Sequence, residues 1–270
     1  MDNRPVGVFD SGLGGLTVVK ALKELMPNEN ILYLGDTGRV PYGSRSKETI
    51  IKYATQSAAF LFEKEIKAMV VACNTVCSVA YDEINEKYDL PVYEVVNAPS
   101  KAAVQSTKNN KIGVIGTTAT IRSGIYESAI HKLNRDITVY CVSCPLFVPL
   151  VEEGWIKNDD EAAIEVAKRY LAELIEMQID TLILGCTHYP LLTGVIQGVM
   201  GNNVTLIDCA TWTAQHIAAD LKIKDKLTGD TGKGTKTQYF VTDSIESFST
   251  QASKYLESDI NNMVTKIELE

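Results

Sequence analysis

The amino-acid sequence predicts an α/β fold made of two similar lobes, each a mainly parallel sheet flanked by helices. Short apolar runs alternate with helix-like stretches along most of the chain, which is the pattern of parallel strands joined by single helices. The pattern also starts again near Lys111, as if one α/β unit had been used twice. We therefore expect the lobes to be related by a pseudo-two-fold axis, with the active site in the cleft between them.

The predicted strands are short apolar runs, as expected for strands covered by helices on both faces. In chain order they span residues 5–10, 30–36, 68–74, 92–97, 111–117, 137–143, 181–186, 204–208, 238–242 and 263–269. The predicted helices lie at about 17–26, 47–65, 79–87, 121–134, 160–177 and 213–221, with one more after residue 186 and another after residue 242. Ser46 and Thr49 are typical of a helix start. A polar loop rich in Gly, Lys and Thr separates Leu221 from Gln238.

The restart indicates an internal duplication. Val6–Gly12 parallels Ile112–Thr118, which lies 106 residues later in the chain. Val70–Thr75 parallels Leu182–His188, and the cysteines of these two segments are 113 residues apart. The alternative is that strand ends in any α/β protein look alike by chance.

The length of 270 residues fits one large domain or two medium ones. We expect a first lobe of residues 1–97 and 208–270, and a second lobe of residues 98–207. The segment after residue 208 is too short for a third domain, so we expect it to return and complete the first lobe.

Composition limits the possible partners and surroundings. The net charge of −8 and the pI of about 5.1 argue against nucleic acid or an acidic membrane as a main partner. The N-terminus lacks a leader pattern and no apolar run is long enough to span a membrane, so we expect a cytoplasmic protein. Its six cysteines are then expected to be reduced thiols used in catalysis or packing rather than in disulfides.

Two of these cysteines follow predicted strands in matching positions. Cys73 stands in the motif ACNT, where Asn74 and Thr75 begin the next helix. Cys186 stands in the motif GCTHYP, followed by Thr187 and His188. A helix N-terminus favours the thiolate form of a nearby cysteine. Either cysteine alone would more often be a small buried hydrophobe, but the repeated arrangement favours a shared chemical role.

The glycine-rich turn after the first strand is not a nucleotide-binding loop. It lacks the lysine of a phosphate loop and the G-x-G-x-x-G spacing of a dinucleotide site. What remains is a turn whose backbone N–H groups suit a carboxylate, with Asp10 and Ser11 at its mouth. Asp10 is alternatively a cap of the following helix.

Two further features have weaker signals. The loop GDTGRVPYGSRS contains Asp36, Arg39, Tyr42 and Gly43, and we expect the Tyr42 hydroxyl and the Gly43 N–H to face a ligand together, unless the loop is a plain surface loop. The segment CPLFVPLVEEG is apolar up to the paired carboxylates Glu152 and Glu153, one of which could orient His188, unless both are solvated.

Cys141 and Cys144 have C-x-x-C spacing, but no second cysteine pair or histidine pair completes a zinc site, so we expect no metal. Cys209 is expected to serve in packing.

Two thiols in one cleft suit the inversion of a carbon stereocentre α to a carboxylate. Inversion by proton transfer needs a base on one face of the substrate and an acid on the other. An ordinary thiol pKa of roughly 8.5 can be shifted towards neutrality, where general acid–base catalysis works best. Without pyridoxal phosphate, the site must stabilise the carbanion by hydrogen bonds to the α-carboxylate.

The motifs together resemble those of the glutamate racemases of the aspartate/glutamate racemase superfamily. The matching segments are DSGLGGLT (10–17), GDTGRVPYG (35–43), ACNT (72–75), IGVIGT (112–117), CPLFVPLVEEG (144–154) and LGCTHYPLL (184–192). The resemblance implies a cofactor-independent two-domain enzyme that interconverts L- and D-glutamate for bacterial peptidoglycan synthesis. It also implies a homodimer. No N-terminal extension of the type that binds a peptidoglycan precursor is seen, so we expect no such activation.

The resemblance also assigns residues. Cys73 would serve D-glutamate and Cys186 the L-isomer, assisted by Asp10, Glu152 and His188. The positions that match substrate contacts are Ser11, Tyr42, Gly43, Asn74, Thr75, Thr117, Thr118 and Thr187. Departures from the family pattern at Gly38, Cys77 and Cys209 lie outside these positions.

Two other functions stay open. One is an aspartate racemase of the same superfamily, although His188 resembles the glutamate enzymes, because the aspartate enzymes commonly carry Glu there. The other is a non-catalytic two-lobe protein that binds an amino acid or an anion.

Overall fold

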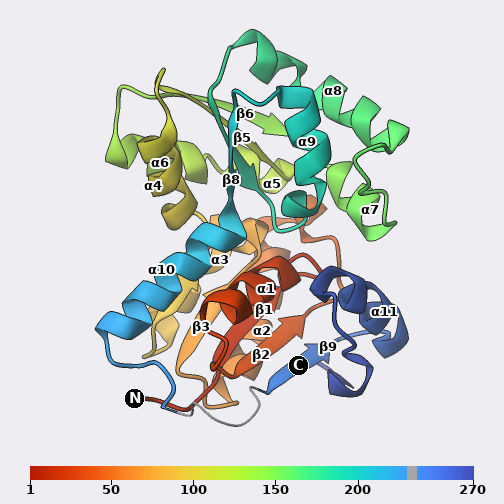
Figure 1. Cartoon of the computed structure of the whole chain (residues 1–270). Helices are drawn as coiled ribbons and strands as arrows, with labels where there is room; N and C mark the ends of the chain where they lie inside the picture. Colours follow the sequence, from red (N-terminus) through yellow and green to blue (C-terminus); the bar gives the residue numbers. More distant parts are fainter. Residues whose placement is uncertain (230–235) are drawn as a thin grey trace. The chain divides into compact units, whose positions relative to one another are not determined.

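A computed structural model describes residues 1–229 and 236–270 of the chain (Figure 1). The chain forms two compact units, Met1–Val95 with Thr213–Glu270, and Val96–Trp212. Each unit has a parallel sheet flanked by helices, which confirms the predicted fold class. The polar loop predicted before Gln238 lies partly outside the described residues. Within the described part of the chain, no helix combines the length and apolar character needed to cross a membrane.

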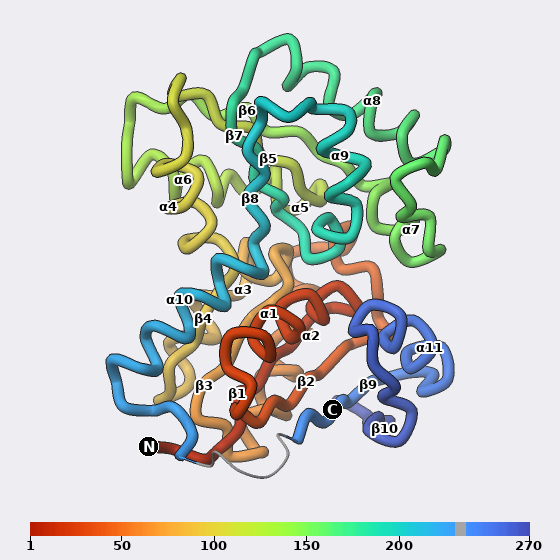
Figure 2. Tube along the Cα trace, in the orientation of Figure 1, coloured from red at the N-terminus to blue at the C-terminus, as the bar shows by residue number. Residues whose placement is uncertain are grey.

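The first unit contains a six-stranded sheet in the order β10-β9-β2-β1-β3-β4, with every neighbouring pair parallel. The strands are β1 (Val6–Asp10), β2 (Ile31–Gly35), β3 (Ala68–Val71), β4 (Val92–Glu94), β9 (Thr237–Val241) and β10 (Val264–Lys266). β1, β2 and β3 are buried throughout, as their apolar sequences predict. Figure 2 shows β9 running beside β2, so the C-terminal segment returns to the first sheet as expected.

The helices of the first unit follow the predicted order, with shifted boundaries at α2, α3 and α10. They are α1 (Leu16–Leu25), α2 (Lys47–Phe62), α3 (Asn74–Lys87), most of α10 (Cys209–Ile223) and α11 (Ile245–Leu256), with 3₁₀ turns η1 (Tyr42–Ser44) and η3 (Asn261–Met263). Ser46 caps α2 by accepting a hydrogen bond from Thr49 N at 3.3 Å. α3 begins five residues before the predicted start at Val79, because Cys73 is its N-cap and already accepts the N–H of Cys77 at 2.9 Å.

The second unit contains a four-stranded parallel sheet in the order β6-β5-β7-β8. Its strands are β5 (Lys111–Gly116), β6 (Thr138–Ser143), β7 (Thr181–Gly185) and β8 (Thr205–Asp208). Its helices are α4 (Asn97–Ser106), α5 (Thr118–Arg122), α6 (Ile125–Leu133), α7 (Phe147–Glu152), α8 (Glu161–Glu176) and α9 (Thr193–Met200), with the 3₁₀ turn η2 (Tyr189–Leu192) before α9.

Four details of the second unit differ from the prediction. α4 and α7 were not predicted. The single helix predicted at 121–134 is divided into α5 and α6, because Gly124 between them adopts a left-handed φ of +65°. The helix expected directly after Cys186 begins as a 3₁₀ turn. Pro190 has no N–H for the α-helical hydrogen bond to Cys186, and the segment instead uses short bonds such as Tyr189 N to Cys186 O.

The two sheets share one strand order and one register. β2-β1-β3-β4 in the first unit corresponds to β6-β5-β7-β8 in the second. Gly7 pairs with Met69 in the first sheet, and Gly113 pairs with Leu182 in the second. These pairs are the ones that the offsets of 106 and 113 residues in the sequence predict. The duplicated pattern in the sequence therefore corresponds to a duplicated sheet architecture.

The packing against the two glycines is duplicated as well. A Cβ atom on Gly7 would lie 2.8 Å from Ile66 Cδ1, and the side chain packed closest to Gly113 is that of Ile179. Ile179 lies 113 residues after Ile66. In both units the glycine of the central strand thus leaves space for an isoleucine that precedes the neighbouring strand. Ile66 lies between α2 and β3, and Ile179 lies between α8 and β7.

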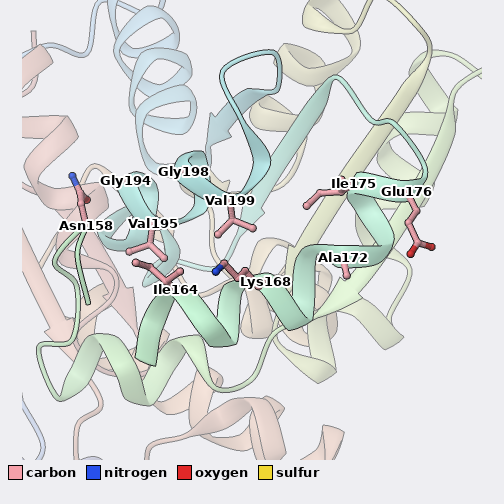
Figure 3. A pocket seen from close by; sticks show the side chains of 10 residues that line it. All are labelled: Asn158, Ile164, Lys168, Ala172, Ile175, Glu176, Gly194, Val195, Gly198 and Val199. Carbon is pink, nitrogen blue, oxygen red and sulfur yellow. The ribbon is translucent and has the colours of Figure 1, made fainter. Parts of the chain in front are cut away.

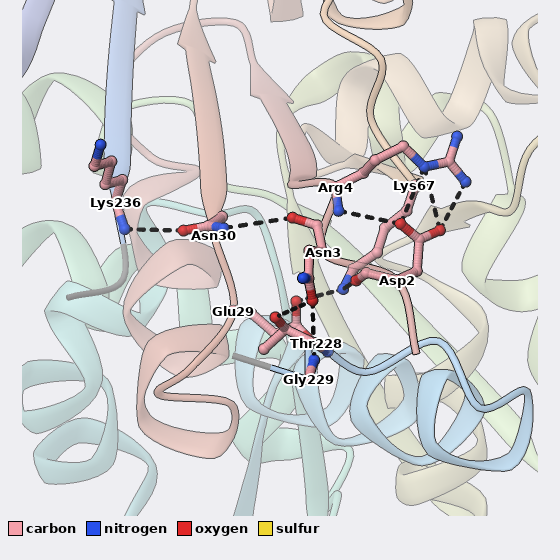
Figure 4. A network of polar contacts seen from close by, with 9 residues as sticks. All are labelled: Asp2, Asn3, Arg4, Glu29, Asn30, Lys67, Thr228, Gly229 and Lys236. Atoms are coloured by element: carbon pink, nitrogen blue, oxygen red, sulfur yellow. Dashed lines mark hydrogen bonds and ion pairs between the residues drawn. The ribbon is translucent and has the colours of Figure 1, made fainter. Parts of the chain in front are cut away.

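A buried ion pair lies at the edge of the first sheet where the strands begin (Figure 4). Lys67 Nζ is 2.5 Å from Glu29 Oε2, and the two side chains are 0% and 2% exposed. Lys67 also donates to the carbonyl of Asp2 at 2.8 Å, while Glu29 accepts the N–H of Thr228 at 2.7 Å. The pair therefore joins the N-terminal segment, the start of β3 and the chain after α10.

Candidate functional site

The first unit brings together residues from two adjacent strand ends. Asp10 ends β1 and Ser11 follows it, whereas Cys73 follows β3, which pairs with β1. The Cys73 thiol donates to Ser11 Oγ at 3.4 Å, although the two residues are 62 positions apart. Residues that follow these two neighbouring strands therefore meet at one edge of the sheet.

Asp10 holds the turn after β1. Its side chain is 1% exposed, and Oδ2 accepts the N–H of Gly12 at 2.9 Å. The N-cap position of α1 is Gly15, five residues after Asp10. Tyr33 fixes the same turn by donating its hydroxyl to the carbonyl of Gly12 at 2.7 Å. Two side-chain hydrogen bonds therefore fix the turn, one to the N–H of Gly12 and one to its carbonyl.

Cys73 stands at the N-cap position of α3, with Asn74 and Thr75 as the first residues of the helix. All three side chains are buried, at 6%, 2% and 3% exposure. The N-terminal N–H groups of a helix favour negative charge, so this is a suitable place for a thiolate or for a substrate carboxylate.

The loop after β2 contains Tyr42 and Gly43, which stay predicted substrate contacts. The Tyr42 hydroxyl donates to Asp36 Oδ2. Burial of the phenol, together with the nearby Asp36 carboxylate, raises the pKa of Tyr42 well above its usual value. The sequence alone indicates Asp36 only as a member of the loop. Its carboxylate partners include Thr242, which is 206 positions away, so no local pattern could have indicated them.

The second unit places Cys186, His188 and Glu152 in a row. Cys186 directly follows β7, and its Sγ lies 3.9 Å from His188 Nδ1. His188 Nε2 lies 3.3 Å from Glu152 Oε1 at the end of α7. Cys186 and His188 are both 5% exposed. A carboxylate on one ring nitrogen and a thiol near the other is an arrangement that orients an imidazole for proton transfer.

Three threonines follow the same two strands of the second sheet. Thr117 follows β5 and caps α5 by accepting the N–H of Thr120 at 3.3 Å, and Thr118 is the first residue of that helix. Thr187 is buried beside Cys186. β5 pairs with β7, so these hydroxyl groups and Cys186 belong to neighbouring strand ends of one sheet.

The other cysteines of this unit have different surroundings. Burial raises the pKa of Cys141 to about 11, and burial followed by the nearby Cys186 raises the pKa of Cys144 as well. Both thiols are therefore expected to be mostly protonated near neutral pH. Cys209 donates to the carbonyl of Leu184 at 3.0 Å, as suits a packing role. Within residues 1–229 and 236–270, no cluster of three or more His, Cys, Asp or Glu side chains suits a metal ion.

A cavity of about 580 Å³ lies elsewhere in the second unit, between α8 and α9 (Figure 3). Its walls include Ile164 and Lys168 of α8, and Gly194 and Gly198 of α9. None of the predicted site residues lines it. We therefore place the candidate site at the strand ends and not in this cavity.

Comparisons with known proteins agree with this arrangement. The family model described as Asp/Glu/Hydantoin racemase matches residues 15–217. A glutamate racemase from Thermoanaerobacter pseudethanolicus is 45% identical over 98% of this chain and 97% of the relative. A solved glutamate racemase isoform from Bacillus anthracis has a TM-score of 0.95 at 38% identity, covering 100% of this chain and 99% of that one. The glutamate racemase from Francisella tularensis, solved in complex with D-glutamate, has a TM-score of 0.89 at 39% identity, covering 100% and 98%. The chain therefore belongs to the glutamate racemases of the Asp/Glu/hydantoin racemase family.

Proposed function

We propose that this chain interconverts L- and D-glutamate with Cys73 and Cys186 as the two proton-transfer groups and without a cofactor. The observation that carries the proposal is the matched placement of the two thiols. Each follows the strand next to the central strand of its sheet, and the two sheets have the same order and register. A protein with one base would have to move that base across the substrate plane to invert a stereocentre, whereas two thiols need no such movement.

The proposed step moves one proton off Cα and another onto it. One cysteine, as a thiolate, takes the Cα proton from one face and becomes a thiol. The carbanion keeps the electron pair, which is delocalised into the α-carboxylate. The other cysteine, as a thiol, then gives its proton to the opposite face and becomes a thiolate. By family analogy, Cys73 takes the proton of D-glutamate and Cys186 that of L-glutamate.

Neighbouring groups are proposed to support each thiol. Ser11, which follows Asp10 in the chain, accepts from the Cys73 thiol. His188 lies near Cys186 and pairs with Glu152 through its other ring nitrogen. Hydrogen-bond donors at the strand ends would hold the substrate carboxylates, which stabilises the charge that develops on the carbanion. The proposed contacts are Ser11, Tyr42, Gly43, Asn74, Thr75, Thr117, Thr118 and Thr187.

The biological role and assembly are proposed from the family. The product D-glutamate would supply peptidoglycan synthesis in the cytoplasm, and the active form would be a homodimer. Sedimentation equilibrium at micromolar concentration tests the assembly, and a single species with the mass of one chain would rule the dimer out.

Circular dichroism of the substrate tests the proposed activity directly. D-Glutamate incubated with the protein, in the absence of pyridoxal phosphate, is expected to lose its optical signal until a racemic mixture remains. A constant signal with folded protein would exclude the racemase and leave a binding protein. Decay of L-aspartate but not of glutamate would instead identify an aspartate racemase.

Substitutions of His188 and Glu152 are expected to lower kcat to different extents. His188→Gln should lower kcat by about 100-fold, within the usual range for loss of an acid–base group. Glu152→Gln keeps the size of the side chain but weakens its hold on the imidazole, so we expect a loss of about tenfold. The matched control is Glu153→Gln, because Glu153 is the exposed neighbour of Glu152. If Glu152→Gln and Glu153→Gln lowered kcat equally, Glu152 would have no specific role.

A further inference from the structure

Asp36 is the centre of a hydrogen-bond network in the first unit. It follows β2, and its side chain is 0% exposed. Oδ2 accepts from Arg39 Nε at 2.6 Å and from the Tyr42 hydroxyl, while Oδ1 accepts from Thr242 Oγ1 at 2.8 Å. Two donors from the loop itself and one from the residue after β9 therefore meet on one buried carboxylate, and burying such a charge requires partners of this kind.

The network restrains the whole loop between β2 and α2. Thr242 Oγ1 accepts the N–H of Gly38 at 2.9 Å in addition to donating to Asp36. The Arg39 guanidinium lies 4.1 Å from the centre of the Tyr53 ring, and its Nη1 donates to Gln56 at 2.5 Å. The loop is thus attached to the end of β9 on one side and to α2 on the other.

The restrained loop lies close to the cysteine of the first unit. The η1 turn, which contains Tyr42 and Gly43, packs against α3, whose N-cap is Cys73. At the start of the loop, the N–H of Asp36 donates to the carbonyl of Asp10 at 3.1 Å. The loop is therefore fixed to both strand ends that carry the proposed catalytic groups of this unit.

A tyrosine hydroxyl has only one proton to donate. The Tyr42 hydroxyl donates that proton to Asp36, so it cannot also donate to a substrate carboxylate. Tyr42 is left with its peptide N–H as a donor, and Gly43 has no other donor than its peptide N–H.

We propose that Asp36 is a positioning residue, which holds the Tyr42–Gly43 peptide N–H groups towards a carboxylate of glutamate while the Tyr42 side chain serves only as an anchor. This inference rests on the proposed function for its substrate. It assigns to Asp36 and Thr242 a part in glutamate affinity, although neither residue touches the substrate.

The test combines kinetics with ligand-dependent stability. Asp36→Asn keeps the shape of the side chain but removes the charge that holds three donors, and Tyr42→Phe removes one of those donors. We expect Asp36→Asn to raise KM by about tenfold with kcat nearly unchanged, and Tyr42→Phe to raise KM by about threefold. The double variant should match Asp36→Asn alone, because the hydroxyl acts only through the carboxylate. Additive effects would mean that the Tyr42 hydroxyl contacts glutamate itself, which would overturn the proposal.

Asp180→Asn is the matched control. Asp180 precedes β7, at the opposite edge of its sheet from Cys186, and its carboxylate accepts from Thr107, Lys108 and Asn109 at 2.7–2.8 Å. We expect this variant to lose stability but to keep its KM. If KM rose equally in Asp180→Asn and Asp36→Asn, the rise would come from general destabilisation, and the positioning role of Asp36 would be refuted. If Asp36→Asn does not fold, Thr242→Val removes one donor to Asp36 and should raise KM by about threefold, and an unchanged KM would then overturn the proposal.

Racemic glutamate separates this inference from the proposed function, because turnover does not change its composition. The increase in Tm that racemic glutamate causes measures affinity even in a protein that does not racemise. A wild type that is stabilised but inactive would refute the racemase, and a weaker stabilisation of Asp36→Asn would still support the positioning role. A wild type that glutamate does not stabilise would overturn both.

Discussion

Replacing either Cys73 or Cys186 by alanine is expected to lower the racemisation rate by at least about 1,000-fold. A positioned acid or base contributes roughly 10²–10⁴-fold to a proton transfer, and the weakly acidic Cα–H of glutamate gives water little chance to take over. Both variants should keep their fold, because each loses only the sulfur atom of a small side chain. The measurement is the decay of the circular dichroism signal of D-glutamate and, separately, of L-glutamate.

Two other cysteines serve as controls for this experiment. Cys77 lies one helical turn beyond Cys73 and donates its thiol to the carbonyl of Val71 at 3.2 Å, while Cys141 is half-buried on β6. Cys77→Ala and Cys141→Ala should racemise glutamate at nearly the wild-type rate. In deuterated water the wild type should place deuterium at Cα of the inverted product. Retained activity in Cys73→Ala or Cys186→Ala would rule out the two-base scheme.

Replacing Lys67 by methionine is expected to lower the free energy of unfolding by about 3–5 kcal/mol, because it leaves the Glu29 carboxylate buried without its cation. The 0% and 2% exposure of the pair allows water little access to either charge. Urea unfolding followed by far-UV circular dichroism is the suitable measurement. Tryptophan fluorescence would report on the wrong part of the chain, since Trp155 and Trp212 both belong to the second unit.

A surface ion pair provides the contrast. Lys20 and Glu257 are 2.9 Å apart, but their side chains are 41% and 79% exposed. Lys20→Met should therefore change the free energy of unfolding by less than about 1 kcal/mol. A loss for Lys67→Met as small as that for Lys20→Met would show that the buried pair does not stabilise the first unit.

The strands were predictable because both faces of a parallel sheet are buried. Each strand then appears in the sequence as a continuous apolar run, such as Val6–Asp10 or Thr181–Gly185, bounded by polar or glycine residues. α4 was not predicted because Asn97–Ser106 contains few large apolar residues and a proline at Pro99, so its periodicity is weak. α7 is one short helix of six residues with Pro149 inside it, which is below the length that a pattern can detect.

Of the candidate site, the sequence could predict only the residues that directly follow strands. The sequence places Cys73 and Cys186 after apolar runs, and parallel pairing then sets each beside the end of a central strand. The partners of the side chains were not predictable in the same way. Asp36 meets Thr242 across 206 positions, and the register and side-chain packing that join them exist only in the folded chain.

The two sheets with their common register would act on a reaction whose equilibrium no protein structure can shift. L- and D-glutamate have the same free energy in water, so the equilibrium constant between them is unity whatever the protein does. The ratio kcat/KM must then be equal in the two directions for the wild type and for every variant. A substitution in one sheet can divide its effect differently between kcat and KM for the two enantiomers, but it cannot turn the enzyme into a one-way catalyst.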